Sequence, residues 1–449
     1  MKVIHHGART GVTGSCHELV DEQCRLLVDC GVFQGKEKSA SPDIEFDIKG
    51  IQALLITHAH IDHIGRIPWL LAAGYNGPIY ASEATAHLVP IMLDDGLKIQ
   101  LGLNKEQRKR FLDIVNTRMR PIPYHCWVQL SQMVGPPVKF RFTPAGHILG
   151  SSIVEIETSQ SKRVVFSGDL GSYGTSLLPD PSVVERADML VLESTYGGKR
   201  HEGVDTRQQA LKAIIERSFE NGGAILIPAF SIGRTQELLF DIENIIAHSQ
   251  PNGPWQEIPI ILDSPLAAKV TEQYQQFKRF WSAEAKERLD AFRHPMAFES
   301  CVRIETHDHH EALVERLRIS GEPAVVIASS GMCTGGRIVN YLKALLPNNN
   351  TDVILAGYQA EGTLGAQLLA GNSNVKVDNK MVDVKAQVHA LSGYSAHADS
   401  QDLIRFVTEF ESEPKVIRLV HGSPDAQKAL AEKLRIIGAN IDIQLGCES

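Results

Sequence analysis

The chain has 449 residues, of which 43% are hydrophobic and 22% charged, so it is long enough for two or three domains and too apolar to be disordered. A net charge of −8 argues against a protein that binds polyanions over its whole surface. It is compatible with a basic cleft at one place on that surface. Seven cysteines without a CxxC pair favour neither disulfides nor a thiolate zinc site. The start lacks a signal pattern and the longest apolar stretch, IPWLLAAGY, is too short to cross a bilayer, so we expect a cytoplasmic protein without membrane contact.

The first 200 residues consist mainly of short apolar runs closed by turn residues. These runs predict strands at 24–31, 51–60, 77–82, 138–147, 152–157, 162–171 and 188–194. Helical apolar spacing occurs at 66–74, 83–97 and 105–116. Because most of the strands follow one another too closely for crossover helices, we expect a largely meandering sheet with helices packed outside it.

After about residue 200, longer helices alternate with buried strands. Helices are predicted at 206–222, 234–249, 335–347 and 363–371, and strands at 223–230, 258–264, 322–331 and 351–359. This alternation indicates a parallel sheet in a second domain. The earlier pattern returns with strands at 382–391 and 415–422 and a helix at 426–438. Residues 201–380 are therefore expected to form a domain inserted between residues 1–200 and 381–449 of the first.

Four potential metal ligands fall within six residues of the segment ITHAHIDHIGR, directly after an apolar run. They are His58, His60, Asp62 and His63. Imidazole and carboxylate groups without thiolates suit catalytic zinc or a similar divalent ion. Alternate residues can serve two ions, with His58 and His60 at one and Asp62 and His63 at the other.

Six further acids and histidines also follow apolar runs: Asp29, His147, Asp169, Glu193, His397 and His421. Since successive strand ends line one edge of a layered αβ fold, they predict a single site. Taken alone, Asp29 or His147 is more often a turn former or a buried polar group, so the repetition of the pattern carries the inference. For Glu193, a helix-start cap in the turn ESTYG is the competing interpretation.

Asp29, the segment HAHIDH, His147 and Asp169 together resemble the four motifs of the metallo-β-lactamase superfamily. Glu193, His397 and His421 are similar to three further motifs of its β-CASP branch. The segments TGVTGSC, PAFSIGRTQELL, LDSPLA, SSGMCTGGR and GYQAEGTLG fit the same branch, and the pattern is similar to bacterial and archaeal homologues of the endonuclease subunit of the pre-mRNA cleavage and polyadenylation factor. The resemblance implies a four-layered αββα fold with an inserted α/β β-CASP domain.

The resemblance also implies two divalent ions, for which zinc is expected and manganese stays open, since His and Asp ligation permits either. One ion would take His58, His60 and His147, and the other Asp62, His63 and His421, with Asp169 bridging the two. The expected chemistry is phosphodiester hydrolysis by a hydroxide held between the ions.

Three residues receive supporting roles. Asp29 is expected to orient a histidine ligand. His397 is expected to act as the general acid that protonates the leaving oxygen, with Glu193 orienting and charging its ring.

By resemblance, a histidine at position 421 favours RNA over DNA as the substrate. In the inserted domain, the residues expected to meet phosphate precede helices, where backbone N–H groups attract anions: Arg234, Ser329, Ser330, Gly331 and Thr334. Glycine turns that serve close packing are the competing interpretation. Two positions differ from the residues usually found in the β-CASP branch. Ser423 stands where an acidic residue is common, and Ala366 stands where a basic residue is common.

The expected function is a metal-dependent endoribonuclease that acts on single-stranded RNA, and assembly as a homodimer stays open. The alternatives are a 5′-exonuclease or DNA-directed member, a thioester or lactone hydrolase, and a non-catalytic RNA-binding protein. Two other segments are rich in histidine or basic residues, and we interpret both as faces exposed to solvent. They are the helix start His307, Asp308, His309 and His310, and the basic run Lys105, Arg108, Lys109, Arg110, Arg118 and Arg120, for which an RNA-facing helix is the alternative.

Overall fold

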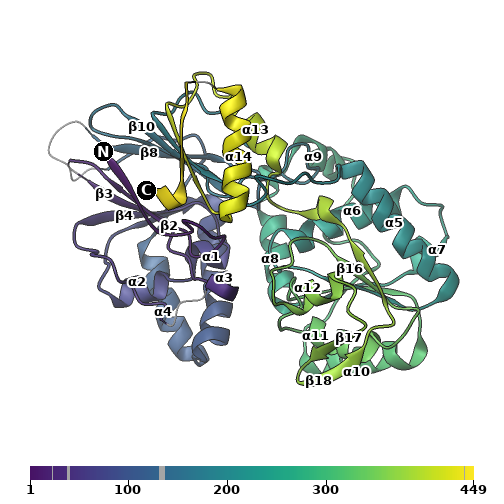
Figure 1. Ribbon diagram of the computed structural model, residues 1–449. Coiled ribbons are helices and arrows are strands. Elements are labelled where there is room, and N and C mark those ends of the chain that lie inside the picture. Colours follow the sequence, from purple (N-terminus) through teal and green to yellow (C-terminus); the bar gives the residue numbers. More distant parts are fainter. Residues whose placement is uncertain (23, 38–40, 131–136, 439, 449) are drawn as a thin grey trace. The chain divides into compact units, whose positions relative to one another are not determined.

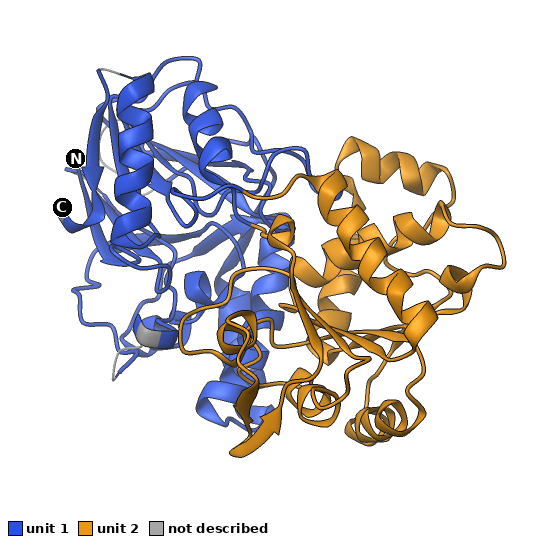
Figure 2. Ribbon diagram, turned by 45° about the vertical axis from the view of Figure 1, so that its right-hand side comes forward, with its two compact units in different colours: residues 1–200, 397–449 blue, residues 201–396 orange. Residues whose placement is uncertain are grey.

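The computed structural model describes all residues except 23, 38–40, 131–136, 439 and 449. The chain divides into two compact units, coloured separately in Figure 2: unit 1 comprises residues 1–200 and 397–449, and unit 2 residues 201–396. The return to unit 1 thus falls after residue 396, whereas the sequence pattern places it after residue 380. The reason is strand β19 (Gln387–Ala390), which pairs in parallel with β16 (Asp352–Leu355) of unit 2.

Unit 1 contains two mixed sheets. The first has the order β1 (Lys2–Gly7), β2 (Cys16–Val20), β3 (Arg25–Val28), β4 (Ile51–Ile56), β5 (Ile79–Ser82) and β6 (Met119–Ile122). The second has the order β21 (Asp442–Leu445), β20 (Val416–Val420), β11 (Met189–Glu193), β10 (Arg163–Phe166), β9 (Ser152–Glu157), β8 (Lys139–Pro144) and β7 (Val128–Gln129).

Each sheet is antiparallel in one half and parallel in the other. In the first sheet the pairs from β3 to β6 are parallel, and in the second the pairs from β10 to β21 are parallel. The expected meander therefore describes only part of each sheet. Helices α1 (Ile61–Ile64), α2 (Ile67–Ala72), α3 (Glu83–Leu101) and α4 (Lys105–Arg118) supply the crossovers that join β4, β5 and β6.

The two sheets pack face to face and are covered by helices, which confirms the expected αββα layering (Figure 1). Between the sheets, Leu26 and Leu55 of the first sheet meet Phe140 and Phe166 of the second. Helices α13 (Ser400–Thr408) and α14 (Pro424–Ile437) pack on the outer face of the second sheet. Helix α3 packs against β5 and β6 of the first. Strands buried on both faces need nearly continuous apolar runs, as RVVF in β10 shows.

Unit 2 is a parallel sheet between two layers of helices, as the βα alternation predicts. Its strand order is β14 (Cys301–Arg303), β13 (Ile260–Asp263), β15 (Ala324–Ala328), β12 (Ala224–Pro228), β16 and β19, and every pair is parallel. One face packs against α5 (Val204–Asn221), α6 (Arg234–Ala247), α7 (Pro254–Glu257) and α8 (Pro265–Gln276).

The other face of this sheet packs against α10 (His307–Ser320), α11 (Ile338–Leu345) and α12 (Leu364–Leu369). Helix α9 (Ala283–Asp290) and the two-stranded sheet of β17 (Asn374–Val377) and β18 (Lys380–Asp383) complete the unit. Among the described residues of the whole chain, no helix combines the length and the apolarity needed to cross a bilayer.

Replacing Phe140 with alanine removes a fully buried ring from the layer between the two sheets. We expect the free energy of unfolding to fall by about 3–5 kcal/mol, because a cavity adds to the lost transfer free energy. Phe292→Ala is the matched control, since that ring is 89% exposed, and its effect should stay within about 0.5 kcal/mol. Urea denaturation followed by circular dichroism measures both values, and equal losses in the two variants would contradict the sheet-on-sheet packing.

Candidate metal centre

The histidines and acids that follow the apolar runs converge in unit 1. They form three groups, and within each group the donor atoms all lie within 4.8 Å of one another. The first group contains His58, His60, His147 and Asp169, the second Asp62, His63 and His421, and the third Asp169, Glu193 and His421. Their positions in the chain span more than 350 residues, and they come from the ends of β4, β8, β10, β11 and β20 and from α1. The structure thus brings together all seven residues expected to be metal ligands.

Ring nitrogens within each group point at one another. In the first group, His60 Nδ1 lies 3.0 Å from His58 Nε2 and 3.0 Å from His147 Nε2. In the second, His63 Nε2 lies 3.2 Å from His421 Nε2, and Asp62 Oδ2 lies 3.5 Å from that same His421 atom. Such convergence of nitrogen and oxygen donors on one point is typical of a metal site.

Asp169 lies between the two groups. Its Oδ2 atom is 3.4 Å from His58 Nε2 and 3.6 Å from His147 Nε2. Its Oδ1 atom is 3.3 Å from His63 Nε2 and 3.7 Å from His421 Nε2. One carboxylate therefore presents a separate oxygen to each group, which is the arrangement expected of a bridging ligand.

Thr57 and Asp29 fix the rings of His58 and His63. Thr57 Oγ1 donates its only proton to Asp29 Oδ2 at 2.8 Å, so it can only accept from His58 Nδ1 at 3.0 Å. Asp29 Oδ2 also faces His63 Nδ1 at 2.7 Å. Both histidines therefore donate from Nδ1 and direct Nε2 into the site. Asp29 has the orienting position predicted for it, whereas the sequence pattern does not point to Thr57.

His421 is oriented in the same way by a second threonine that sequence reasoning missed. Thr195 Oγ1 donates to the His421 carbonyl oxygen at 3.0 Å and therefore accepts from His421 Nδ1 at 3.1 Å. His421 and Asp29 both have left-handed backbone conformations, with φ of 51° and 60°. Residues strained in this way are common at functional sites, where the surrounding bonds hold them. The signal in the sequence is the position of Thr57 directly before His58 and of Thr195 two residues after Glu193.

The electrostatics of the cluster favour a cation. Burial lowers the pKa of His58 well below its usual value and lowers the pKa of His60 to about 4, so both rings are neutral and able to bind a metal. Burial opposes a charge on His63 as well, but Asp169 and Asp29 raise the pKa of that ring well above its ordinary value. Asp169 Oδ1 is buried and accepts no hydrogen bond from any described residue. A buried carboxylate oxygen without a hydrogen-bond donor among the described residues and the neutral rings of His58 and His60 fit divalent metal ions.

His397 and Glu193 form a pair beside the cluster. His397 Nδ1 lies 3.2 Å from both carboxylate oxygens of Glu193 and 3.9 Å from Asp169 Oδ2. Although burial disfavours the charged ring, these two carboxylates raise the pKa of His397 to about 9. Glu193 also accepts from the backbone N–H of Leu170 at 2.7 Å. Because no helix starts at the fully described turn after β11, the competing interpretation of Glu193 as a helix cap does not hold.

The residues expected to meet phosphate lie in unit 2, at the carboxyl ends of β12 and β15. Arg234 begins α6, and its buried Nε has no hydrogen-bond partner among the described residues. In the loop after β15, Ser330 N donates to Gly335 O at 3.1 Å and Thr334 N to Ser330 Oγ at 3.1 Å. These two backbone N–H groups are thus used inside the loop, contrary to the expectation that they are available to an anion. Ser329 Oγ lies 3.2 Å from Ser264 Oγ, and Gly331 packs against the Phe230 ring.

The two departures from the branch pattern have different structural settings. Ser423 is the N-cap of α14, and its hydroxyl accepts from Ala426 N at 3.3 Å. Serine and aspartate cap helices equally well, which explains why serine can replace an acid there. Ala366 lies in the first turn of α12, where its N–H donates to Thr363 Oγ1 at 3.2 Å.

One residue of the dense segment at the start of α10 is not solvated. His307, Asp308 and His309 are exposed as expected, but His310 is fully buried. Its Nδ1 lies 2.6 Å from Asp263 Oδ2 at the end of β13. The first turn of an amphipathic helix has one inward face, and His310 is the histidine placed on it.

Comparison with known families divides the chain into three matching regions. Residues 9–226 match the model of the metallo-beta-lactamase superfamily, residues 235–368 that of the Beta-Casp domain, and residues 381–444 that of the Zn-dependent metallo-hydrolase RNA specificity domain. A crystal structure of a protein of unknown function from Enterococcus faecalis shares the fold, with a TM-score of 0.54 at 15% identity over 94% of this chain and 95% of that one.

Three named proteins are similar in sequence over more than nine tenths of this chain. A ribonuclease of Thermus thermophilus is 35% identical over 99% of this chain and 98% of its own length. The transcription termination factor FttA of Methanocaldococcus jannaschii is 30% identical over 98% of this chain and 71% of its own, and an RNase J-like protein of the same organism is 30% identical over 93% and 91%. The chain therefore belongs to the β-CASP branch of the metallo-β-lactamase superfamily.

Proposed function

We propose that this β-CASP protein is a metal-dependent ribonuclease that cuts single-stranded RNA internally. The observation that carries the proposal is the convergence of five imidazoles and two carboxylates, Asp62 and Asp169, in one cluster, with the His397–Glu193 pair beside them. A hydrolase of small thioesters or lactones could use the metal ligands, but it has no need for a His–Glu pair that holds a proton. The similarity to a ribonuclease and to an RNase J-like protein supports RNA as the substrate.

The proposed ligands are divided between two ions that share Asp169. His58, His60 and His147 would hold one ion, and Asp62, His63 and His421 the other. When bound, divalent ions neutralise phosphate charge and lower the pKa of water enough to provide a nucleophile at neutral pH. Zinc is the proposed ion, because the ligand set as a whole contains five histidine nitrogens and two carboxylates.

His397 is proposed as the general acid. Departure of an RNA oxygen as an alkoxide is unfavourable at neutral pH, so a positioned proton donor lowers the barrier. With Nδ1 held by Glu193, the ring can deliver its proton from Nε2, and the two neighbouring carboxylates keep it protonated at neutral pH. Glu193 is itself fixed by the Leu170 N–H, so it acts as a positioning residue for the ring.

RNA recognition is assigned in part to unit 2. Arg234, Ser329, Ser330, Gly331 and Thr334 are proposed to contact the sugar-phosphate backbone, with the unpartnered Nε of Arg234 as the supporting observation among the described residues. The preference for RNA over DNA is proposed to depend on His421. Whether the chain forms a homodimer does not enter this proposal, because every proposed ligand comes from one unit.

The direct test is incubation of the zinc-loaded protein with end-labelled RNA, DNA of the same sequence and a thioester substrate. We expect internal RNA fragments to appear first, with at least tenfold slower cleavage of DNA and no thioester turnover. Accumulation of mononucleotides without intermediate fragments would instead indicate a 5′-exonuclease. Turnover of the thioester alone would overturn the proposal.

Asp169→Asn tests the shared carboxylate. We expect RNA cleavage to fall below detection and the metal content, measured by elemental analysis, to drop, because the charge that holds both groups together is lost. Circular dichroism of the variant should match that of the wild type, because asparagine keeps the shape of the replaced side chain. Full cleavage activity in this variant would exclude a bridging role for Asp169.

His397→Ala separates proton donation from metal binding. We expect kcat to fall about 10²–10⁴-fold, the usual contribution of a general acid, while the metal content stays at the wild-type level. His309→Ala is the matched control, because this exposed histidine in α10 should leave kcat unchanged. Loss of metal together with activity would make His397 a ligand instead of an acid.

A further inference from the structure

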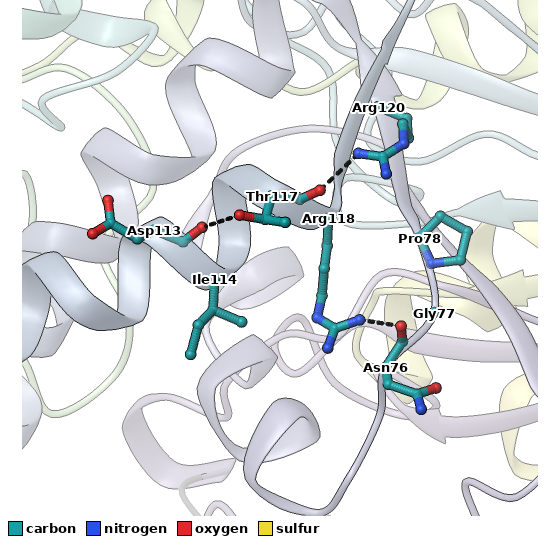
Figure 3. Close-up of a pocket in the computed structure, with 8 residues that line it drawn as sticks. All are labelled: Asn76, Gly77, Pro78, Asp113, Ile114, Thr117, Arg118 and Arg120. Atoms are coloured by element: carbon teal, nitrogen blue, oxygen red, sulfur yellow. Dashed lines mark hydrogen bonds between the residues drawn. The ribbon is translucent and has the colours of Figure 1, made fainter.

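Unit 1 has a pocket of about 550 Å³ to which no residue of the metal centre contributes. Its wall consists of the last two turns of α4, the start of β6 and the loop before β5 (Figure 3). The lining residues are Asn76, Gly77, Pro78, Asp113, Ile114, Thr117, Arg118 and Arg120. A volume in the range of about 300–1,000 Å³ is typical of small-molecule sites.

Arg118 at the end of α4 and Arg120 in β6 differ from two other arginines of α4. Arg108 is paired with Asp94 at 2.7 Å and Arg110 with Glu106 at 2.6 Å. No described carboxylate lies within 4.0 Å of the guanidinium group of Arg118 or Arg120, and Asp113 is the one acid in the pocket wall. The pocket therefore keeps a net positive charge in a chain whose overall charge is −8.

Both guanidinium groups are held in place by carbonyl oxygens. Arg118 Nη1 donates to Asn76 O, and Arg120 Nη1 donates to Thr117 O at 2.8 Å and to Met119 O at 2.9 Å. Arg118 Nε is buried and has no hydrogen-bond partner among the described residues. Because neutral carbonyls fix the groups without cancelling their charge, the pocket is preorganised for an anion.

The remaining wall is partly apolar. Figure 3 shows Pro78 between the two guanidinium groups in this view and Ile114 across from Arg118. Ile114 is 48% exposed although it is a large apolar side chain. Planar guanidinium forks match phosphate oxygens, and guanidinium faces stack on bases. The space exceeds that of a single phosphate and suits a phosphate with its sugar and base.

We propose that this pocket binds one ribonucleotide unit through its phosphate. None of the residues that line the pocket belongs to the metal centre. The choice of RNA as the source of that unit rests on the proposed function. A free nucleotide offers the same chemistry, so the test has one arm for each source. On the RNA chain, the pocket anchors a segment of the strand outside the bond that is cut.

The RNA arm uses the full-length protein with Asp169→Asn, so that a fluorescent 30-nucleotide RNA stays intact during anisotropy titrations. Arg118→Ala and Arg120→Ala should each weaken RNA binding about tenfold, the usual effect of removing one charge-assisted hydrogen bond. The slope of log Kd against log salt concentration should be smaller in each variant than in the wild type. The expected difference is about 0.7 for each RNA phosphate that the variant no longer neutralises. Arg110→Ala, which removes an equal charge from an ion-paired arginine of the same helix, is the matched control and should change Kd less than twofold.

Asp113→Asn should change RNA affinity in the opposite direction to the arginine variants. This substitution keeps the size of the side chain and removes only its charge. Removing the one carboxylate of the pocket wall should tighten RNA binding about two- to threefold, because this carboxylate repels the bound phosphate. The variant should stay folded, since Asp113 bonds to Thr117 through its backbone carbonyl, which accepts from Thr117 Oγ1 at 2.8 Å.

The nucleotide arm is calorimetric titration of adenosine 5′-monophosphate into the wild type and the two arginine variants. Binding of the nucleotide that both variants abolish, with RNA affinity unaltered, would assign the pocket to free nucleotides. If neither ligand responds to Arg118→Ala or Arg120→Ala, or if Arg110→Ala weakens RNA binding equally, the pocket proposal is overturned. Failure of the wild type to cut RNA, with these binding changes present, would overturn the proposed function alone.

Discussion

The chemistry of unit 1 depends on one buried carboxylate that faces two groups of imidazoles. Asp169 is 2% exposed, and each of its oxygens lies 3.3–3.7 Å from ring nitrogens of a different group. An anion in such surroundings is stable only where positive charge compensates it. Without metal, that charge comes from protons, since Asp169 raises the pKa of both His63 and His421 against the effect of burial. Metal ions would replace those protons, so binding a cation introduces no new repulsion into the site.

The precision of the site comes from residues behind the ligands. Two threonine hydroxyls, Thr57 and Thr195, each donate their single proton elsewhere and thereby force a histidine to donate from Nδ1. The left-handed backbone at Asp29 and His421 costs on the order of 1–3 kcal/mol at each position. Hydrogen bonds to Thr57 and Thr195 offset that cost and direct the Nε2 lone pairs toward the centre. A site built this way is preorganised, because its rings do not have to turn when the ions bind.

The sequence predicts which acids and histidines gather in unit 1, but it does not predict the threonines that orient them. The ligands are chemically distinctive, and the rule that strand ends share a sheet edge brings Asp29, His147, Asp169 and His421 to one place without knowledge of the structure. Thr57 and Thr195 are ordinary strand and turn residues, whose roles depend on distances of about 3 Å that spacing cannot specify. The assignment of strand β19 to unit 2 is hidden for a related reason, since its pairing with β16 is a long-range choice that local pattern does not encode. His310 shows the same limit, because the density of histidines alone does not distinguish the buried ring from its exposed neighbours.

His397, the proposed proton donor, is held by contacts within unit 1, although it is the first residue after the inserted unit. The backbone on either side of His397 is held within unit 1, by Ser172 Oγ donating to the His397 carbonyl at 3.0 Å and by Ala398 N donating to Leu170 O at 2.7 Å. Leu170 N in turn holds Glu193, so the segment after Asp169 positions both members of the acid pair. The proposed acid and its carboxylate partner thus depend on the short stretch of unit 1 that follows Asp169. Unit 2 supplies none of the residues in these contacts, and its proposed contribution is therefore to hold the RNA strand rather than to carry out the chemistry.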